Sequence, residues 1–223
     1  MFDQTEIKHN IQKHILSILL RQKVARFRDL RPPRVDTNLY SYHLKQLLTQ
    51  GYVEKVQSGY TLSPLGLSYV DRVNADKFFV RHQPKIITML LIQDGYGNVL
   101  LQRRTKQPYI DTWTLPYGKV HIDDTSVMAG AVREAYEKLA LAGTEPRHVG
   151  DAYIRVMTDH AVLSSTLVHV CRFELEHYKE SDTIRWCAPL KLSSYELAPA
   201  VEQIVTRSFF GDDFFFGEYD VEL

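Results

Sequence analysis

The sequence predicts a mixed α/β (α+β) protein in which a small, mainly helical domain precedes a larger α/β domain. Apolar residues recur at helical spacing from Ile7 to Leu20, whereas residues 85–92 form a continuous apolar run rich in β-branched side chains. Charge also divides the chain, because residues 1–82 hold 13 Lys and Arg against 7 Asp and Glu, and residues 83–223 hold 14 against 20. A length of 223 residues allows two separate cores.

Helix and turn signals define the elements of the first domain. Asp36 is a candidate helix N-cap, Gly51 is a helix stop, and Ser63-Pro64 begins a further helix. In chain order, the expected elements are a helix over 7–20, a short second helix over 27–30 that Pro32 and Pro33 stop, a third helix from Thr37 to Gly51, a hairpin over 52–62 and a last helix through Val73.

This order resembles the winged helix-turn-helix domain of ArsR- and MarR-type regulators, over roughly residues 5–75. Residues 40–47 are similar to their recognition helix, and Gly51–Lys55 precedes the wing as in those proteins. The resemblance implies that residues 1–76 form a winged helix-turn-helix domain that binds double-stranded DNA as a homodimer. Because the first domain is basic and the second is acidic, we expect a polyanionic partner to bind the first domain only. The alternative is a domain used for protein contact or kept as a dimerisation scaffold.

The candidate DNA contacts lie on the third helix and around it. The first turn of a recognition helix reaches base edges in the major groove. Asn38 can pair with adenine, and Ser41 with a base or a phosphate. The full set of candidates is Arg34, Thr37, Asn38, Ser41, Lys45 and Lys55, of which the three basic residues are suited to phosphates.

Strand and turn signals recur in the second domain. The apolar run ends at the turn cluster Asp94–Asn98, so residues 85–104 predict a hairpin. Further strands are expected over 153–157, 165–175 and 184–190, and a helix over 197–208. The tail that starts at Phe209 mixes aromatic and acidic residues, and we expect it to pack on a domain surface or on a partner subunit.

A helix after Gly118 brings charged residues together. Glu134 and Glu137 are three residues apart and share one helix face, where two carboxylates suit Mg²⁺, an ion that prefers oxygen ligands. Lys138 lies on the same face, four residues after Glu134. An ammonium group donates hydrogen bonds, accepts none and repels a cation, so Lys138 can occupy the space of a metal and neutralise Glu134. The alternative is an ordinary pair on a solvated helix surface.

This segment resembles the box of the Nudix family, G-x5-E-x7-R-E-U-x-E-E-x-G-U. The pattern Trp113-x-x-Pro116-x-Gly118, which leads into it, is also similar to that family. Arg133, Glu134 and Glu137 match the motif, while Lys138 and Ala140 stand where it has Glu and Gly. The resemblance covers about residues 83–210. It implies a Nudix α/β/α sandwich over 83–223, with Arg133, Glu134 and Glu137 as catalytic residues and the two glutamates as Mg²⁺ ligands. Because Lys138 replaces a glutamate of the motif, the resemblance implies that Mg²⁺ binds weakly or not at all.

The loop before the helix has one residue more than the motif. Counting from Gly118 places Asp124 at the first Glu of the motif, and counting back from Arg133 places Thr125 there; we prefer an insertion that leaves Asp124 as a shortened carboxylate. The role we favour for this segment is capping of the helix N-terminus, for which the candidates are Asp123, Asp124, Thr125 and Ser126.

Two function classes fit these features. The first is a DNA-binding regulator whose Nudix-like domain binds a nucleoside-diphosphate-type metabolite with weak or absent hydrolysis. The second is an active Mg²⁺-dependent Nudix hydrolase with an accessory winged helix, aided by a distal carboxylate from Glu174, Glu176 or Glu180. The candidate ligand-binding residues are Gly118, Lys119, Arg103, Arg104, Asp124 and Lys138.

The remaining features concern the cysteines, His121 and the location of the protein. Cys171 and Cys187 are two thiols in apolar strand-like contexts, so we expect buried core residues and neither a disulfide nor a metal set. His121 is expected to be structural, and the sequence has no zinc-binding spacing. No signal peptide or long apolar span is present, which predicts a cytoplasmic protein without a membrane partner.

Overall fold

The protein folds as two units, Met1–His82 and Gln83–Leu223, each with its own hydrophobic core. The structure is a computed structural model that describes residues 7–74, 83–159, 161–209 and 214–222. Within these residues, none of the helices has the length and apolar character needed to span a membrane.

The first unit packs three helices against a small hairpin. Its core joins Ile15 and Leu16 of the first helix to Tyr40, Leu44 and other buried residues of the second. Tyr40 is fully buried, and its hydroxyl donates to the Phe27 carbonyl oxygen at 2.8 Å. The elements are α1 (Asn10–Leu19), α2 (Thr37–Thr49), β1 (Val53–Val56), β2 (Gly59–Leu62) and α3 (Pro64–Asp71).

The predicted helix boundaries of this unit are confirmed where a capping residue sets them. The Asp36 carboxylate accepts from the backbone N–H groups of Asn38 and Leu39, and Ser63 caps α3 through Gly66 N–H. Gly51 follows α2 with φ 78°, a left-handed conformation that glycine adopts without steric cost.

The predicted short helix over 27–30 is wrong. These residues form a turn, in which Asp29 and Leu30 both donate to the Arg26 carbonyl oxygen at 3.0 and 3.3 Å. Ala25 instead pairs with Tyr60 through two backbone hydrogen bonds, which adds a third, one-residue strand to the hairpin. Between this bridge and Pro32 the chain has room for a single turn, and one turn does not repay the cost of nucleating a helix.

The second unit is built on one eight-stranded sheet. The strand order is β10-β7-β8-β3-β4-β5, with β6 paired to β3 and β9 paired to β4. The elements are β3 (Lys85–Gln93), β4 (Val99–Arg103), β5 (Trp113–Thr114), β6 (Tyr117–Lys119), α4 (Val127–Leu139), β7 (Arg147–Thr158), β8 (Ala161–Glu174), β9 (Ile184–Cys187), the 3-10 helix η1 (Pro189–Ser194), α5 (Val201–Phe209) and β10 (Phe215–Glu222).

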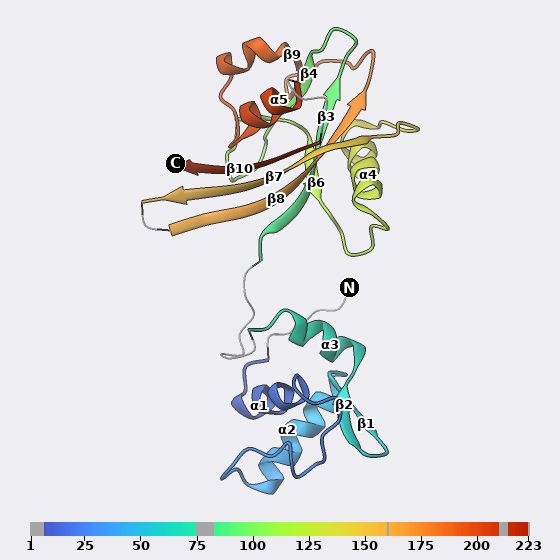
Figure 1. Ribbon diagram of the computed structural model, residues 1–223, viewed down its shortest axis with the longest axis vertical. Coiled ribbons are helices and arrows are strands. Elements are labelled where there is room, and N and C mark those ends of the chain that lie inside the picture. Colours follow the sequence, from blue (N-terminus) through green and yellow to red (C-terminus); the bar gives the residue numbers. More distant parts are fainter. Residues whose placement is uncertain (1–6, 75–82, 160, 210–213, 223) are drawn as a thin grey trace. The chain divides into compact units, whose positions relative to one another are not determined.

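Helices cover both faces of this sheet, which confirms the predicted α/β/α sandwich (Figure 1). Side chains alternate along β3, so Met89 and Leu91 pack with α5 and η1, whereas Leu90 and Ile92 pack with α4. Because β3 is buried on both faces, it has the continuous apolar sequence of a central strand. The thiols of Cys171 and Cys187 are buried and free, as predicted.

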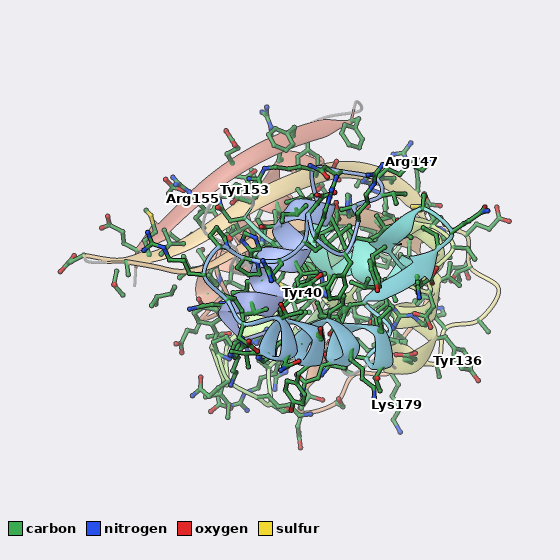
Figure 2. All side chains as sticks on the ribbon, turned by 90° about the horizontal axis from the view of Figure 1, so that it is seen from below. Tyr40, Tyr136, Arg147, Tyr153, Arg155 and Lys179 are labelled. Atoms are coloured by element: carbon green, nitrogen blue, oxygen red, sulfur yellow. The ribbon has the colours of Figure 1, made fainter. Side chains whose placement is uncertain are left out.

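Residues 215–222, in the aromatic and acidic tail, form a strand that the sequence did not predict. β10 pairs in parallel with β7, from Phe215 beside Gly150 to Glu222 beside Met157. An exposed ion pair between Arg155 and Asp220 joins the two strands (Figure 2). The tail therefore extends the sheet at its edge.

Candidate functional site

Arg133 of α4 is the hydrogen-bonding centre of the segment that resembles the Nudix box. Its Nε and Nη2 donate to the two carboxylate oxygens of Asp124 at 2.9 Å each, and Nη1 donates to Glu134 Oε1 at 2.8 Å. Nη2 also donates to the Lys119 carbonyl oxygen at 3.0 Å, which joins the helix to β6. These bonds hold the pKa of the Asp124 carboxyl well below its usual range, so the pair stays ionised near neutral pH.

Asp124 does not cap α4. The cap is Ser126, whose hydroxyl accepts from Ala129 N–H at 3.0 Å. Both Asp124 oxygens bond Arg133, and one also accepts from His121 N–H at 2.7 Å. Asp124 therefore pairs with Arg133 and with the His121 backbone, and it leaves the capping position to Ser126. Its carboxylate orders the loop beside the cleft and is not among the groups that line it.

Glu134 lies between two cations in the interior of the site. Arg133 donates to its Oε1, and the Lys138 ammonium lies 3.6 Å from its Oε2. The Glu134 side chain is only 7% exposed, so an ordinary pair on a solvated surface is the wrong interpretation of Glu134 and Lys138. Gly118 permits this burial, because a Cβ at that position would lie 1.7–2.1 Å from the Glu134 carboxylate atoms.

The carboxylates of this segment do not form a fitting Mg²⁺ site. Both Glu134 oxygens already face cations, and Glu137, whose side chain is exposed, has one oxygen 3.4 Å from Arg133 Nη1. The proposed distal carboxylates Glu174, Glu176 and Glu180 do not line the cleft. Glu180 instead accepts from the backbone N–H of Trp186 at 2.8 Å. A divalent ion would first have to displace the Lys138 ammonium.

A cleft of about 470 Å³ opens between α4, β6 and the end of β4. Its walls carry more positive than negative charge, and two glutamates are its only acidic lining groups among the described residues. The cationic lining residues are Arg103, Arg104, Lys106, Lys119 and Lys138; the acidic ones are Glu134 and Glu137. Such a set attracts a polyanion of the size of a diphosphate.

Tyr117 holds two of these cations in place, a role that the sequence did not reveal. Arg104 donates to the Tyr117 hydroxyl and, through Nε, to the Pro108 carbonyl oxygen at 2.8 Å. The Arg104 guanidinium lies 5.2 Å from the centre of the Tyr117 ring, and the Lys138 ammonium lies 5.9 Å from it. The one signal in the sequence was an aromatic residue directly before Gly118.

A second hollow, of about 320 Å³, adjoins the cationic cleft. The two share Arg104, Thr114, Tyr117 and Lys119. The second hollow is more apolar, and its lining includes Ile87, Met89, Pro108, Tyr109, Ile154 and Val156. Apolar and aromatic walls next to a cationic cleft suit a planar base or a sugar joined to a diphosphate.

The first unit presents its candidate DNA-binding residues on and near α2. Thr37, Asn38 and Lys45 are exposed on the helix, while Ser41 is half-buried. Thr37 Oγ1 accepts from Arg31 at 2.7 Å. Arg34, before the helix, and Lys55, on β1, are also exposed.

Comparison with known proteins places the second unit in a family. The model of the NUDIX domain matches residues 82–207, while none of the curated proteins compared with the chain matches it. A MutT protein from Bacillus halodurans has a similar fold, with a TM-score of 0.50, 18% identity, and coverage of 61% of this chain and 89% of that one.

Two structures of NrtR from Shewanella oneidensis are also similar. Its NUDIX domain complexed with ADP ribose gives a TM-score of 0.49 at 14% identity, covering 64% of this chain and 96% of that one. NrtR complexed with a 27mer DNA gives 0.46 at 16% identity, covering 55% and 59%. At these identities the likeness concerns the fold alone. Because the domain model spans more than half of the 223 residues, the chain belongs to the NUDIX family.

Proposed function

We propose that this protein is a DNA-binding transcriptional regulator whose NUDIX domain binds a nucleoside-diphosphate-type metabolite, with weak or absent hydrolysis. The observation that carries the proposal is the Lys138 ammonium, which faces the buried Glu134 carboxylate where a NUDIX enzyme needs a carboxylate for metal. In this arrangement the protein's own cations do the neutralising that a metal ion would do, and they can hold a diphosphate without one.

Weak hydrolysis follows from the same donor set. When bound, a divalent ion would polarise the phosphoryl group and activate water. Lys138 and Arg133 neutralise Glu134, so Glu137 alone offers an exposed carboxylate in the cleft. The cleft residues can bind and orient the diphosphate, but none of them replaces the metal in activating water. Binding without turnover is the behaviour expected of a metabolite sensor.

Features of the first unit support the DNA-binding half of the proposal. The order α1, α2, hairpin, α3 matches the expected winged helix-turn-helix order except that a turn over 27–30 stands where its second helix is expected; α2 is the proposed recognition helix, and Ala25 adds a third strand to the hairpin. The unit carries the basic excess of the chain. Binding as a homodimer to a palindromic site, with half-sites about one helical turn apart, is part of the proposal.

Two substitutions separate base recognition from phosphate binding. Asn38→Ala should reduce discrimination between sequences by about 1–3 kcal/mol, because an amide that pairs with adenine is lost. Lys55→Ala should weaken binding to all duplexes and flatten the salt dependence, since a phosphate contact is lost. Gel-shift titrations of both variants and the wild type across a salt series, with the upstream region of the protein's own gene as probe, measure both effects.

The same gel-shift experiment tests the proposal itself. If no duplex binds below about 10 µM at low salt, which is the range of non-specific affinity, the regulator is excluded. The active hydrolase with an accessory winged helix then becomes the better account. The observation that favours the hydrolase is Glu137, which lies in the cleft three residues after Glu134, so movement of Lys138 would expose two carboxylates.

A further inference from the structure

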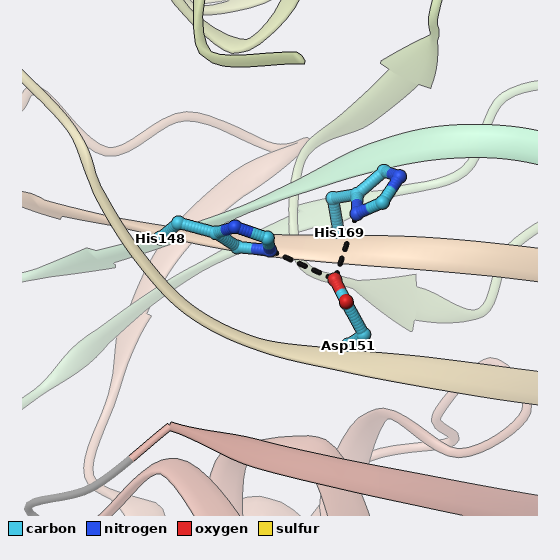
Figure 3. A group of neighbouring side chains, drawn as sticks. All are labelled: His148, Asp151 and His169. Atoms are coloured by element: carbon cyan, nitrogen blue, oxygen red, sulfur yellow. Dashed lines mark hydrogen bonds and ion pairs between the residues drawn. The ribbon is translucent and has the colours of Figure 1, made fainter.

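Two histidines and an aspartate meet on the sheet of the second unit, and none of them lines the cationic cleft. His148 Nε2 lies 2.8 Å from Asp151 Oδ1, and His169 Nδ1 lies 2.7 Å from the same oxygen (Figure 3). One ligand atom from each residue lies within 4.8 Å of the other two. The side chains are 16–32% exposed, so solvent reaches the group.

An irregularity of β7 brings these residues to one face. His148 and Asp151 are three positions apart and would point to opposite faces of a regular strand. The β7–β8 register shifts between His148 and Gly150, so that His148 lies opposite Cys171 and Asp151 lies opposite His169. Such a bulge redirects a side chain and is frequent beside functional sites. The group therefore depends on a specific backbone feature.

Packing from the start of β10 holds the bulge and one ligand. The Phe214 ring meets the His148 ring edge-on, with centres 5.0 Å apart. Phe215 packs so closely on Gly150 that a Cβ there would lie 2.2–2.6 Å from its ring. The His148 ring is thus held by two contacts, the Phe214 ring and the Asp151 carboxylate. A fixed ring loses less conformational entropy when it binds a ligand.

We propose that His148, Asp151 and His169 bind one divalent transition-metal ion of the Zn²⁺ type. Two imidazoles and one carboxylate suit Zn²⁺ and its neighbours, not Mg²⁺ or Ca²⁺, and three protein ligands leave a fourth position for water. Bonds of about 2.0–2.1 Å in a tetrahedron separate ligand atoms by roughly 3.4 Å, so each N···O distance has to open by roughly 0.6 Å. His148 would bind through Nε2 and His169 through Nδ1. These nitrogens donate to Asp151 in the metal-free protein, so on metal binding the hydrogen of each neutral ring moves to its other nitrogen.

The test is calorimetric titration of ZnCl₂ into chelator-stripped full-length protein. The wild type should bind one equivalent with a Kd of about 1 µM or lower. Asp151→Asn, which keeps the shape of the side chain, and His169→Gln should each weaken binding at least about tenfold. His177→Ala, which removes an exposed histidine elsewhere, should bind as the wild type does.

Two further measurements test the metal site even if the Asp151 or His169 variant folds poorly. On wild-type protein, Co²⁺ should give the visible absorption of a tetrahedral site and should broaden the imidazole NMR signals of His148 and His169. Glu137→Gln, a change in the cationic cleft, should leave Zn²⁺ affinity unchanged. Absence of Zn²⁺ binding by the wild type, or equal affinity in folded Asp151→Asn, overturns the proposal, and the group is then a hydrogen-bonded cluster only.

Discussion

Arg133→Ala is expected to destabilise the second unit by about 2–4 kcal/mol, because it leaves the Asp124 carboxylate without its cation and the buried Glu134 carboxylate with Lys138 alone. Asp124 and Glu134 each have side chains that are 7% exposed, and Arg133 bonds both. The substitution also removes the bond from Arg133 to the Lys119 carbonyl oxygen, which joins α4 to β6. Loss of this one side chain therefore disturbs the loop, the helix and the adjoining strand together.

Chemical denaturation followed by tryptophan fluorescence measures this effect in the full-length protein. The chain has two tryptophans, Trp113 and Trp186, and both belong to the second unit, so their signal reports on that unit. Arg155→Ala is the matched control, since it removes an arginine whose ion pair with Asp220 is exposed, and its effect should be much smaller. Equal losses for the two variants would contradict a central structural role for Arg133.

Reversing the charge of Arg103 and Arg104 together is expected to weaken diphosphate binding about 100-fold, or about 2.7 kcal/mol. The two guanidinium groups line the cleft opposite the box helix, and the reversal turns two attractive contacts into repulsive ones. Arg104 also donates a hydrogen bond to the Tyr117 hydroxyl. Without Arg104, the Tyr117 ring, over which the Lys138 ammonium lies, loses that contact.

Calorimetric titration with ADP-ribose, used as a nucleoside-diphosphate probe, checks this prediction. A double variant of Arg147→Glu and Lys179→Glu changes the net charge equally at exposed positions outside the cleft (Figure 2). That control should retain wild-type affinity. If the Arg103→Glu, Arg104→Glu variant also retains it, the diphosphate does not bind in this cleft.

Local sequence signals predicted much of the fold because each acts over a few residues. Asp36, Gly51 and Ser63 end or begin helices through contacts with their own neighbours, and the structure confirms all three. The turn over 27–30 was misassigned because the bridge between Ala25 and Tyr60, which spans 35 positions, decides the local conformation. The β10 strand was missed for a similar reason, since its pairing partner β7 is far away in the sequence.

The sequence predicted which residues share a site only where a motif fixed their spacing. The box spacing predicted that Glu134, Glu137 and Lys138 share a helix face, but it did not predict that Glu134 is buried beneath Gly118. No spacing rule joins His148, Asp151 and His169, because a bulge reverses the alternation between the first two and a hairpin brings in the third.

The central claim is that the cleft binds a diphosphate through its own cations and without a metal. Titration of ADP-ribose into the wild type and Lys138→Glu, each in EDTA and in Mn²⁺, tests it most directly. Wild-type affinity for ADP-ribose is expected to be the same in both solutions, whereas Lys138→Glu should bind Mn²⁺ more tightly than the wild type and should need Mn²⁺ to bind ADP-ribose. Wild-type binding that requires Mn²⁺, or turnover of the ligand at about 1 s⁻¹ or faster, would contradict the account.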